Sequence, residues 1–261
     1  MSLTNQYLQQ CGNIMNKVGG QQTLIQKAAD WFAETIMAGR VVHVFGSGHS
    51  RMMVEEMWPR YGSFPGFNPI VELSLTYHNS VVGANGQRQA MFLENVTGLS
   101  ERILRNFNLS ENDCALIISS SGCNIVPIEM AELFQRKKIK VVSLITSEHS
   151  KMSKSKRGDG KKLSDFSDLI LDSGAPVGDA MIYIDGLQTP VSPGSTIGGI
   201  MIINCIKAEL AGILTKAGKP PKVLTAPVIL GEEKAASLFE SAYDEHSRRL
   251  AELYKGMGSD E

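Results

Sequence analysis

The chain has 261 residues, of which 43% are hydrophobic and 20% charged, with 25 Gly and 10 Pro, a composition typical of folded globular proteins and unlike that of fibrous or disordered ones. Its 26 Lys and Arg against 27 Asp and Glu give a formal net charge of -1, so no overall positive field attracts nucleic acid or an anionic membrane. The 4 cysteines have no paired spacing, which argues against a disulfide framework and against a Cys-rich zinc site.

Two amphipathic helices are predicted ahead of the first strand, in an N-terminal helical arm over residues 1–38. Apolar side chains recur there at helical spacing, and Gly19-Gly20 separates the two runs. The beginning of the chain holds no apolar stretch of the kind found in signal peptides, so we expect a soluble, cytoplasmic protein. The residues that share a face are Tyr7, Cys11, Ile14 and Val18 in the first run and Leu24, Ala28, Phe32 and Ile36 in the second.

Farther along the chain, short apolar runs alternate with helical stretches. Such alternation predicts an α/β fold with a parallel sheet that is covered on both faces. Crossover helices are expected over residues 98–107 and 124–137. The predicted strands cover residues 41–45, 69–75, 114–118, 140–145 and 169–171.

The apolar stretch 195–214 is predicted to be a buried helix rather than a membrane span, because Asn204, Lys207 and Glu209 interrupt it. The stretch 147–165 is rich in Lys and Ser and is predicted to be a mobile surface loop.

A last amphipathic helix is expected over about residues 232–255. Because no internal repeat and no long linker divides the chain, we predict a single domain over residues 1–261, with its core at about residues 20–215.

Two polar loops stand at the point where a predicted strand leads into a predicted helix. They are Gly46-Ser47-Gly48-His49-Ser50 and Ser119-Ser120-Ser121-Gly122-Cys123-Asn124. Helix N-termini favour anions, Ser hydroxyls donate hydrogen bonds, and Gly lets the backbone approach a ligand closely. Neither loop contains the Lys of a Walker A loop, and the first lacks the third Gly of a dinucleotide fingerprint.

The two loops are expected to face one crevice. In a doubly wound sheet of strand order 2-1-3-4-5, strands 1 and 3 are neighbours, and ligands bind beyond their carboxyl ends. The first loop follows strand 1 and the second follows strand 3. Their pairing therefore predicts a site for a phosphorylated ligand at this edge of the sheet.

The two loops resemble the signature loops of SIS (sugar isomerase) domains, which bind phosphorylated sugars. Within that superfamily, the chain is most similar to an uncharacterised group related to phosphoheptose isomerases. The segments Ser119 to Ala131 and Ala175-Pro176-Val177-Gly178-Asp179-Ala180 carry this similarity together with the first loop. The resemblance implies a three-layer sandwich around a five-stranded parallel sheet, a homodimer or homotetramer, and a sugar site near a subunit interface.

The resemblance also implies which residues bind the sugar phosphate. Ser119, Ser121 and Asn124 match the phosphate-binding positions, although many relatives have Ser or Thr where this chain has Asn124. Ser47 and Ser50 are expected to contact the sugar or to complete the anion site. The full set of expected binding residues is Ser47, Gly48 and Ser50 with Ser119, Ser120, Ser121, Gly122 and Asn124.

Aldose–ketose isomerisation needs a base beside the α carbon and a second group that handles the oxygen-bound proton. Glu56 resembles the base of phosphoheptose isomerases if a gap of about one helical turn is allowed, and this gap leaves the choice between Glu55 and Glu56 open. The second catalytic residue of those enzymes is a His in the helix that matches 195–214, where this chain has none. His49 and His78 are the two candidates that remain.

The other histidines are expected to be structural. His43 lies within an apolar predicted strand, and His149 and His246 are interpreted as surface or packing residues. No HExxH motif or Cys/His spacing points to a metal, and we expect neither a metal site nor a cofactor.

The sequence therefore predicts a phosphosugar-binding protein, with isomerisation by a Glu base as the leading function. A non-catalytic phosphosugar sensor and an amino-sugar phosphate lyase are the alternatives. The expected partners are a phosphorylated sugar and further copies of the chain, with no nucleic acid and no membrane.

Overall fold

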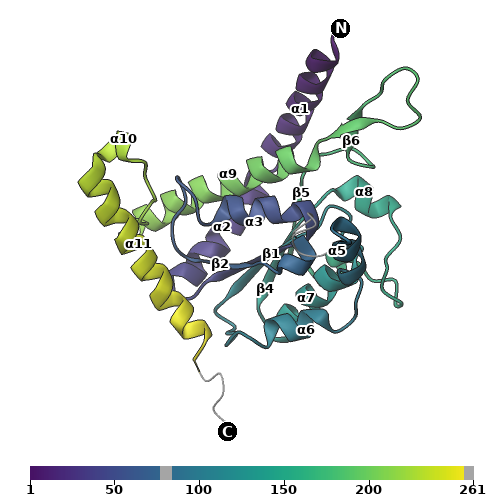
Figure 1. Cartoon of the computed structure of the whole chain (residues 1–261). Coiled ribbons are helices and arrows are strands. Elements are labelled where there is room, and N and C mark those ends of the chain that lie inside the picture. The colour runs from purple at the N-terminus through teal and green to yellow at the C-terminus, as the bar shows by residue number, and fades with distance from the viewer. Residues whose placement is uncertain (77–83, 256–261) are drawn as a thin grey trace.

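A computed structural model of the chain describes residues 1–76 and 84–255. Its centre is a parallel sheet in the order β2-β1-β3-β4-β5, which confirms the predicted topology (Figure 1). The strands of this sheet are β1 (Val42–Gly46), β2 (Phe67–Ile70), β3 (Cys114–Ile118), β4 (Lys140–Ile145) and β5 (Leu169–Asp172).

Successive side chains of the central strands point to opposite faces of the sheet, as the two-residue period of a strand requires. In β3, Leu116 and Ile118 join one hydrophobic core, and Ala115 and Ile117 join the other. Because both faces are covered, the strands read as continuous apolar runs.

Helices cover both faces and complete the three layers (Figure 1). On one face lie α2 (Gln22–Met37), α3 (Arg51–Met57) and α9 (Ser195–Lys216), and on the other lie α6 (Leu99–Leu104) and α7 (Ile125–Arg136). The remaining helices are α1 (Leu3–Gly19), α4 (Leu73–Thr76), α5 (Gln87–Leu93), α8 (Ser147–Met152), α10 (Pro227–Leu230) and α11 (Glu232–Leu253), with short 3-10 turns η1 (Gly48–Ser50) and η3 (Leu163–Phe166).

Helix α9 is a core element of the fold. Among the described residues it is the one helix long and apolar enough to cross a membrane, by length and composition only. Within the fold, its buried side chains, Ile202, Ile203, Ile206 and Leu210 among them, belong to the hydrophobic core beneath α2 and α3. Gly198 permits this close packing, since a Cβ there would lie 1.8 Å from the carbonyl oxygen of Ser173. The predicted buried helix is therefore present, and it begins at Ser195 as expected.

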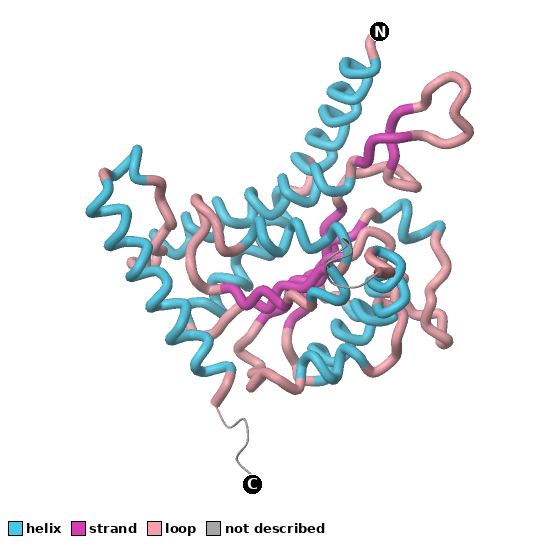
Figure 2. The backbone as a smooth tube through the Cα atoms, in the orientation of Figure 1, coloured by secondary structure: helices cyan, strands magenta, loops and turns pink. Residues whose placement is uncertain are grey.

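Helix α1 and a small hairpin project together from the body of the molecule (Figure 2). The hairpin pairs β6 (Ala180–Ile182) with β7 (Val191–Pro193). The hydroxyl of Tyr7 donates to the carbonyl oxygen of Pro193 at 3.1 Å and so joins the two projections.

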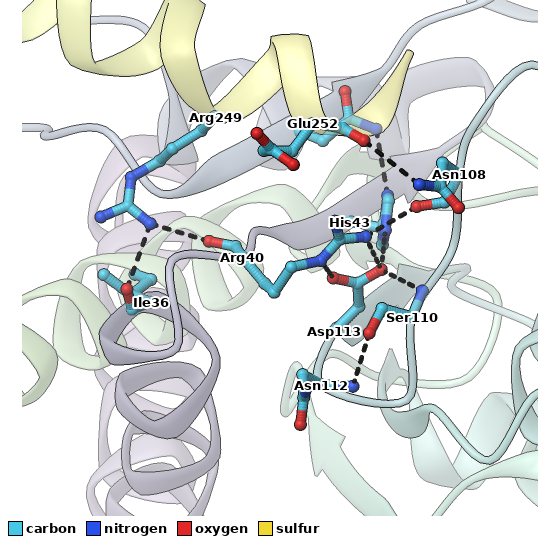
Figure 3. Close-up of polar contacts among 10 residues, drawn as sticks. Ile36, Arg40, His43, Asn108, Ser110, Asn112, Asp113, Arg249 and Glu252 are labelled. Atoms are coloured by element: carbon cyan, nitrogen blue, oxygen red, sulfur yellow. Dashed lines mark hydrogen bonds and ion pairs between the residues drawn. The ribbon is translucent and has the colours of Figure 1, made fainter. Parts of the chain in front are cut away.

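A buried polar network lies at the amino end of the sheet, away from the two loops (Figure 3). The Asp113 carboxylate accepts hydrogen bonds from Arg40 at 2.7 and 3.0 Å and lies 3.2 Å from Nε2 of His43. The guanidinium of Arg249, on α11, donates to the carbonyl oxygens of Ile36 and Arg40. This network makes His43 the core histidine that its apolar strand predicts, and it ties α11 to the α2–β1 turn.

Two segments differ from their predicted structure. The second strand ends at Ile70, and 73–76 forms α4, because the apolar run that extends to Leu75 does not distinguish a strand from a short helix. The stretch 147–165 contains α8 and η3 instead of a mobile loop. The prediction rested on the polar composition of this stretch and overlooked Leu163 and Phe166, whose buried side chains pack against α7.

Candidate active site

A cavity of about 340 Å³ opens beyond the carboxyl ends of the central strands. Ligands bind at this edge of doubly wound sheets, between the first and third strands. Both polar loops reach the cavity, as do the residues that follow β4 and β5 and the first turn of α9. Its polar lining consists of Ser47, His49, Ser50, Gln87, Glu94, Ser119, Ser120, Ser121, Asn124, Thr146, His149, Ser173, Asp179, Ser195 and Thr196.

The first loop turns sharply from β1 into η1 and α3. Gly46 is required at the turn, because a Cβ there would lie 2.7 Å from the carbonyl oxygen of Ser50. Gly48 adopts a φ of +57°, which glycine tolerates best. The turn brings Ser47, His49 and Ser50 to the cavity wall.

In the second loop, main-chain N–H groups fix the serine side chains. The N–H of Gly122 donates to Oγ of Ser119 at 3.2 Å, and the N–H of Cys123 donates to Oγ of Ser121 at 3.2 Å. Both hydroxyl oxygens thus accept a backbone hydrogen bond, and each O–H remains a donor that can turn toward a ligand. The loop leads into α7, where the N–H of Val126 donates to the main-chain carbonyl oxygen of Glu94 at 3.0 Å and Pro127 has no N–H to offer.

Two hydroxyls that the sequence analysis did not identify, those of Thr146 and Ser173, continue a row that begins at the expected residue Ser120 and follows the ends of β3, β4 and β5. Ser120 Oγ lies 3.0 Å from Thr146 Oγ1, which lies 2.7 Å from Ser173 Oγ. The signal for these residues was present, since Thr146 comes directly after one predicted strand and Ser173 lies two residues after another. The chain of hydroxyls suits a ligand with several hydroxyl groups of its own.

Glu94 is the carboxylate that lies between the two loops. It caps the C-terminus of α5, and its side chain accepts hydrogen bonds from Ser47, at 2.8 Å, and from Asn124. Burial raises the pKa of Glu94 above its usual value, and these two hydrogen bonds offset the rise only in part. No Lys or Arg stands among the described residues that line the cavity.

Asp179 holds the N-terminus of α9 at the far side of the cavity. Its carboxylate accepts the N–H groups of Gly194 and Ser195 at 3.0 and 2.6 Å and the Ser195 hydroxyl at 2.9 Å. His149, on α8, also lines the cavity rather than the outer surface, which corrects its interpretation as a surface or packing residue.

The structure does not bring the two expected glutamates to the cavity. Glu55 pairs with Arg51 at 2.7 Å on the exposed side of α3. Glu56 faces a second hollow, lined by α3 and α11 residues, where it contacts Arg60, Asn204 and Lys207.

The partners of Glu56 make its carboxylate a poor base. Burial alone would raise its pKa, but hydrogen bonds from Asn204 and Arg60 and the positive charge of Lys207 bring the pKa below its usual value. A carboxylate that is held in its charged form accepts a proton reluctantly.

The remaining expected residues divide between the cavity and the undescribed part of the chain. His49 lines the cavity together with Gly48, and Gly122 shapes the second loop with a φ of +61°. His78 lies outside the described residues. Within 1–76 and 84–255, no group of three or more His, Cys, Asp or Glu side chains could hold a metal ion.

Comparisons with known proteins agree with this architecture. A model of the SIS domain matches residues 6–147. A UPF0309 protein of Thermoanaerobacter pseudethanolicus is 33% identical over 235 residues, which cover 88% of each chain.

Two solved structures share the fold at low sequence identity. A phosphoheptose isomerase from Francisella tularensis superimposes with a TM-score of 0.51 at 15% identity, over 79% of this chain and 95% of that one. The Vibrio vulnificus NanR protein, solved in complex with ManNAc-6P, gives a TM-score of 0.51 at 13% identity, over 93% of this chain and 69% of that one.

Proposed function

Because the chain belongs to the SIS domain family, we propose that its cavity binds a phosphorylated sugar and that Glu94 catalyses aldose–ketose isomerisation. The observation that carries the proposal is the place of Glu94. It is a partly buried carboxylate between two serine-rich loops, with a pKa above its usual value.

The phosphate is bound by the second loop in this proposal. Ser119, Ser120 and Ser121 supply hydroxyl donors, and the start of α7 supplies the partial positive charge of a helix N-terminus. The sugar chain then extends along the hydroxyl row formed by Thr146 and Ser173.

Glu94 is better suited to proton abstraction than Glu56. A base works best when its pKa lies near the pH of the reaction, and burial moves the pKa of Glu94 in that direction. Cations hold Glu56 in its charged form and keep its pKa low. In the proposed reaction, the Glu94 carboxylate takes a proton from the carbon next to the carbonyl group and returns it to the carbonyl carbon.

The test combines binding with exchange of hydrogen for solvent deuterium. Hexose, heptose and amino-sugar phosphates, with ManNAc-6P among them, are titrated into the protein by calorimetry and then incubated in heavy water. We expect label at the α carbon of the substrate and its product. Glu94→Gln should abolish labelling and retain binding, whereas Glu56→Gln should retain both.

The other outcomes assign the alternatives. Binding without label for every sugar phosphate would overturn isomerisation and favour a sensor. Label together with release of an ether substituent would favour a lyase. Labelling that persists in Glu94→Gln and disappears in Glu56→Gln would show that Glu56, on α3, is the base.

We also propose that the protein acts in the cytoplasm as a homodimer. The outer faces of α1, α2 and α9 form an apolar groove lined in part by Met15, Ile200 and Met201. Met15 and Leu8 are more than half exposed on α1, which projects from the body of the fold (Figure 1). Pairing with a second copy would remove these side chains from water.

A further inference from the structure

His149 is oriented by a hydrogen bond at the edge of the cavity. The main-chain N–H of Gly178 donates to its Nδ1 at 3.0 Å. Nδ1 is therefore the acceptor of the ring, and the proton of the neutral imidazole is carried by Nε2. The ring lines the same cavity as Glu94, so an imidazole donor and a carboxylate share one site.

The segment that holds His149 is itself fixed. Asp179 follows Gly178 directly and has a φ of +71°, a backbone conformation that is costly for a residue with a side chain. The bonds from Asp179 to Gly194 and Ser195 at the start of α9 hold this conformation in place. The Gly178 N–H is thus held by the fold in the direction of the imidazole.

The backbone of His149 is anchored as well. Its carbonyl oxygen accepts the N–H of Ser153 at 3.0 Å and the Ser153 hydroxyl at 2.8 Å, which close the last turn of α8. Both the ring and the main chain are therefore held, as a group that must meet a small ligand requires.

From this geometry we propose that His149 is the second catalytic residue of the cavity, and that Gly178, in the Ala175–Ala180 segment, sets its tautomer. The proposal rests on the proposed isomerisation at Glu94. It gives a role to a sequence motif that phosphate binding leaves unexplained.

The proton transfers balance without any further reactant. As Glu94 removes the proton from the α carbon, Nε2 of His149 gives its proton to the carbonyl oxygen, and an enediol forms. Nε2 then takes the proton of the neighbouring hydroxyl, and Glu94 returns its proton to the adjacent carbon. A neutral imidazole is competent for this role, because its ring N–H can polarise a carbonyl group and donate a proton to the oxygen.

A spectroscopic experiment tests the contact independently of turnover. Long-range proton–nitrogen spectra of the full-length protein, with the His149 signals assigned by their loss in His149→Asn, report which ring nitrogen is protonated. We expect the Nε2–H tautomer in the free protein. A bound sugar phosphate should shift the Nε2 resonance, and inorganic phosphate should leave it near its original value.

Kinetics test the chemical role. His149→Ala should lower kcat for isomerisation by about 10²- to 10⁴-fold, as expected for loss of general acid–base catalysis, and should change sugar phosphate affinity far less. Lys151→Ala, an exposed change on the same helix, serves as the control and should leave kcat unchanged.

The outcomes separate this proposal from the function on which it rests. Three results would overturn the role of His149 alone. They are an Nδ1–H tautomer, an Nε2 resonance that does not shift when a sugar phosphate binds, and a kcat of His149→Ala within about twofold of the wild-type value. Failure of every sugar phosphate to bind would overturn both proposals. Binding that moves the Nε2 resonance in a protein without isomerase activity would overturn isomerisation and, with it, the catalytic role of His149.

Discussion

The hydroxyl of Ser47 donates to the carboxylate of Glu94 at 2.8 Å, across 47 residues of sequence. Asn124, from the second loop, donates to the same carboxylate. Glu94 therefore connects the two loops between which we propose that a phosphorylated sugar binds. The same two hydrogen bonds favour its charged form, while burial favours its neutral form.

This balance predicts that Ser47→Ala changes the pH dependence of the proposed isomerisation. Glu94 must be ionised to accept a proton, so kcat/KM falls as the pH drops through the Glu94 pKa. Loss of the Ser47 hydrogen bond removes an interaction that lowers this pKa. The acid limb of the profile should therefore move to higher pH.

A carbon NMR titration of the Glu94 carboxyl group measures the same pKa without turnover. Ser237→Ala, an exposed change on α11, is the matched control and should leave both the profile and the titration unchanged. An acid limb that stays in place or moves to lower pH in Ser47→Ala would contradict the assigned balance.

The second loop should contribute to affinity without any cationic side chain. Ser119→Ala and Ser121→Ala each remove a hydroxyl that can donate to a phosphate oxygen, and each should weaken binding by about 1 kcal/mol, or roughly fivefold in Kd. Calorimetry with the tightest-binding sugar phosphate measures the loss. Unchanged affinity in the double variant would show that this loop does not bind the phosphate.

The sheet and both loops could be predicted because their signals are local. Buried parallel strands appear as short β-branched runs, and their alternation with helices indicates a doubly wound sheet, from which the order 2-1-3-4-5 was expected. The resemblance to SIS domains rests on these loops, and the family match over 6–147 confirms it.

Glu94 and His149 could not be found this way, because their roles depend on tertiary contacts. Glu94 caps the short helix α5 and meets Ser47 only through folding. His149 lies in a Lys- and Ser-rich stretch whose composition resembles that of a solvent-exposed loop. Glu56 was expected in the crevice because α3 begins at the first loop, but the helix directs it toward Arg60 and Lys207.

The network at the amino end of the sheet should stabilise the fold in a pH-dependent way. Burial alone would raise the Asp113 pKa, but hydrogen bonds from His43 and Arg40 lower it below its unfolded value. Such a carboxylate adds stability above the unfolded pKa, and this contribution is lost as the pH falls through the folded pKa.

Arg40→Ala should therefore destabilise the protein by about 3–5 kcal/mol at neutral pH, because it removes two hydrogen bonds and the neighbouring positive charge from a buried carboxylate. Its acid unfolding should begin at a higher pH than that of wild type. Denaturant titrations followed by circular dichroism measure both effects. Lys140→Ala breaks a pair with Glu34 in which both side chains are about half exposed, and it should cost at most about 1 kcal/mol. Equal losses of unfolding free energy in the two variants would contradict the prediction that the buried Arg40–Asp113 pair contributes more than an exposed pair.

The apolar groove over α1, α2 and α9 predicts a concentration-dependent dimer. Leu8→Glu and Met15→Glu place charges on side chains that are 61% and 57% exposed in one chain, so neither change should disturb the fold of the monomer. If a second copy covers this face, each change removes about 1–3 kcal/mol of apolar burial and weakens the dimer roughly tenfold or more. Sedimentation velocity across a dilution series measures the shift. Val228→Glu, at an 89% exposed site on α10, is the control and should leave the dimer intact. A wild-type chain that sediments as a monomer at every concentration, or variants that dimerise as tightly as wild type, would show that this face is not the interface.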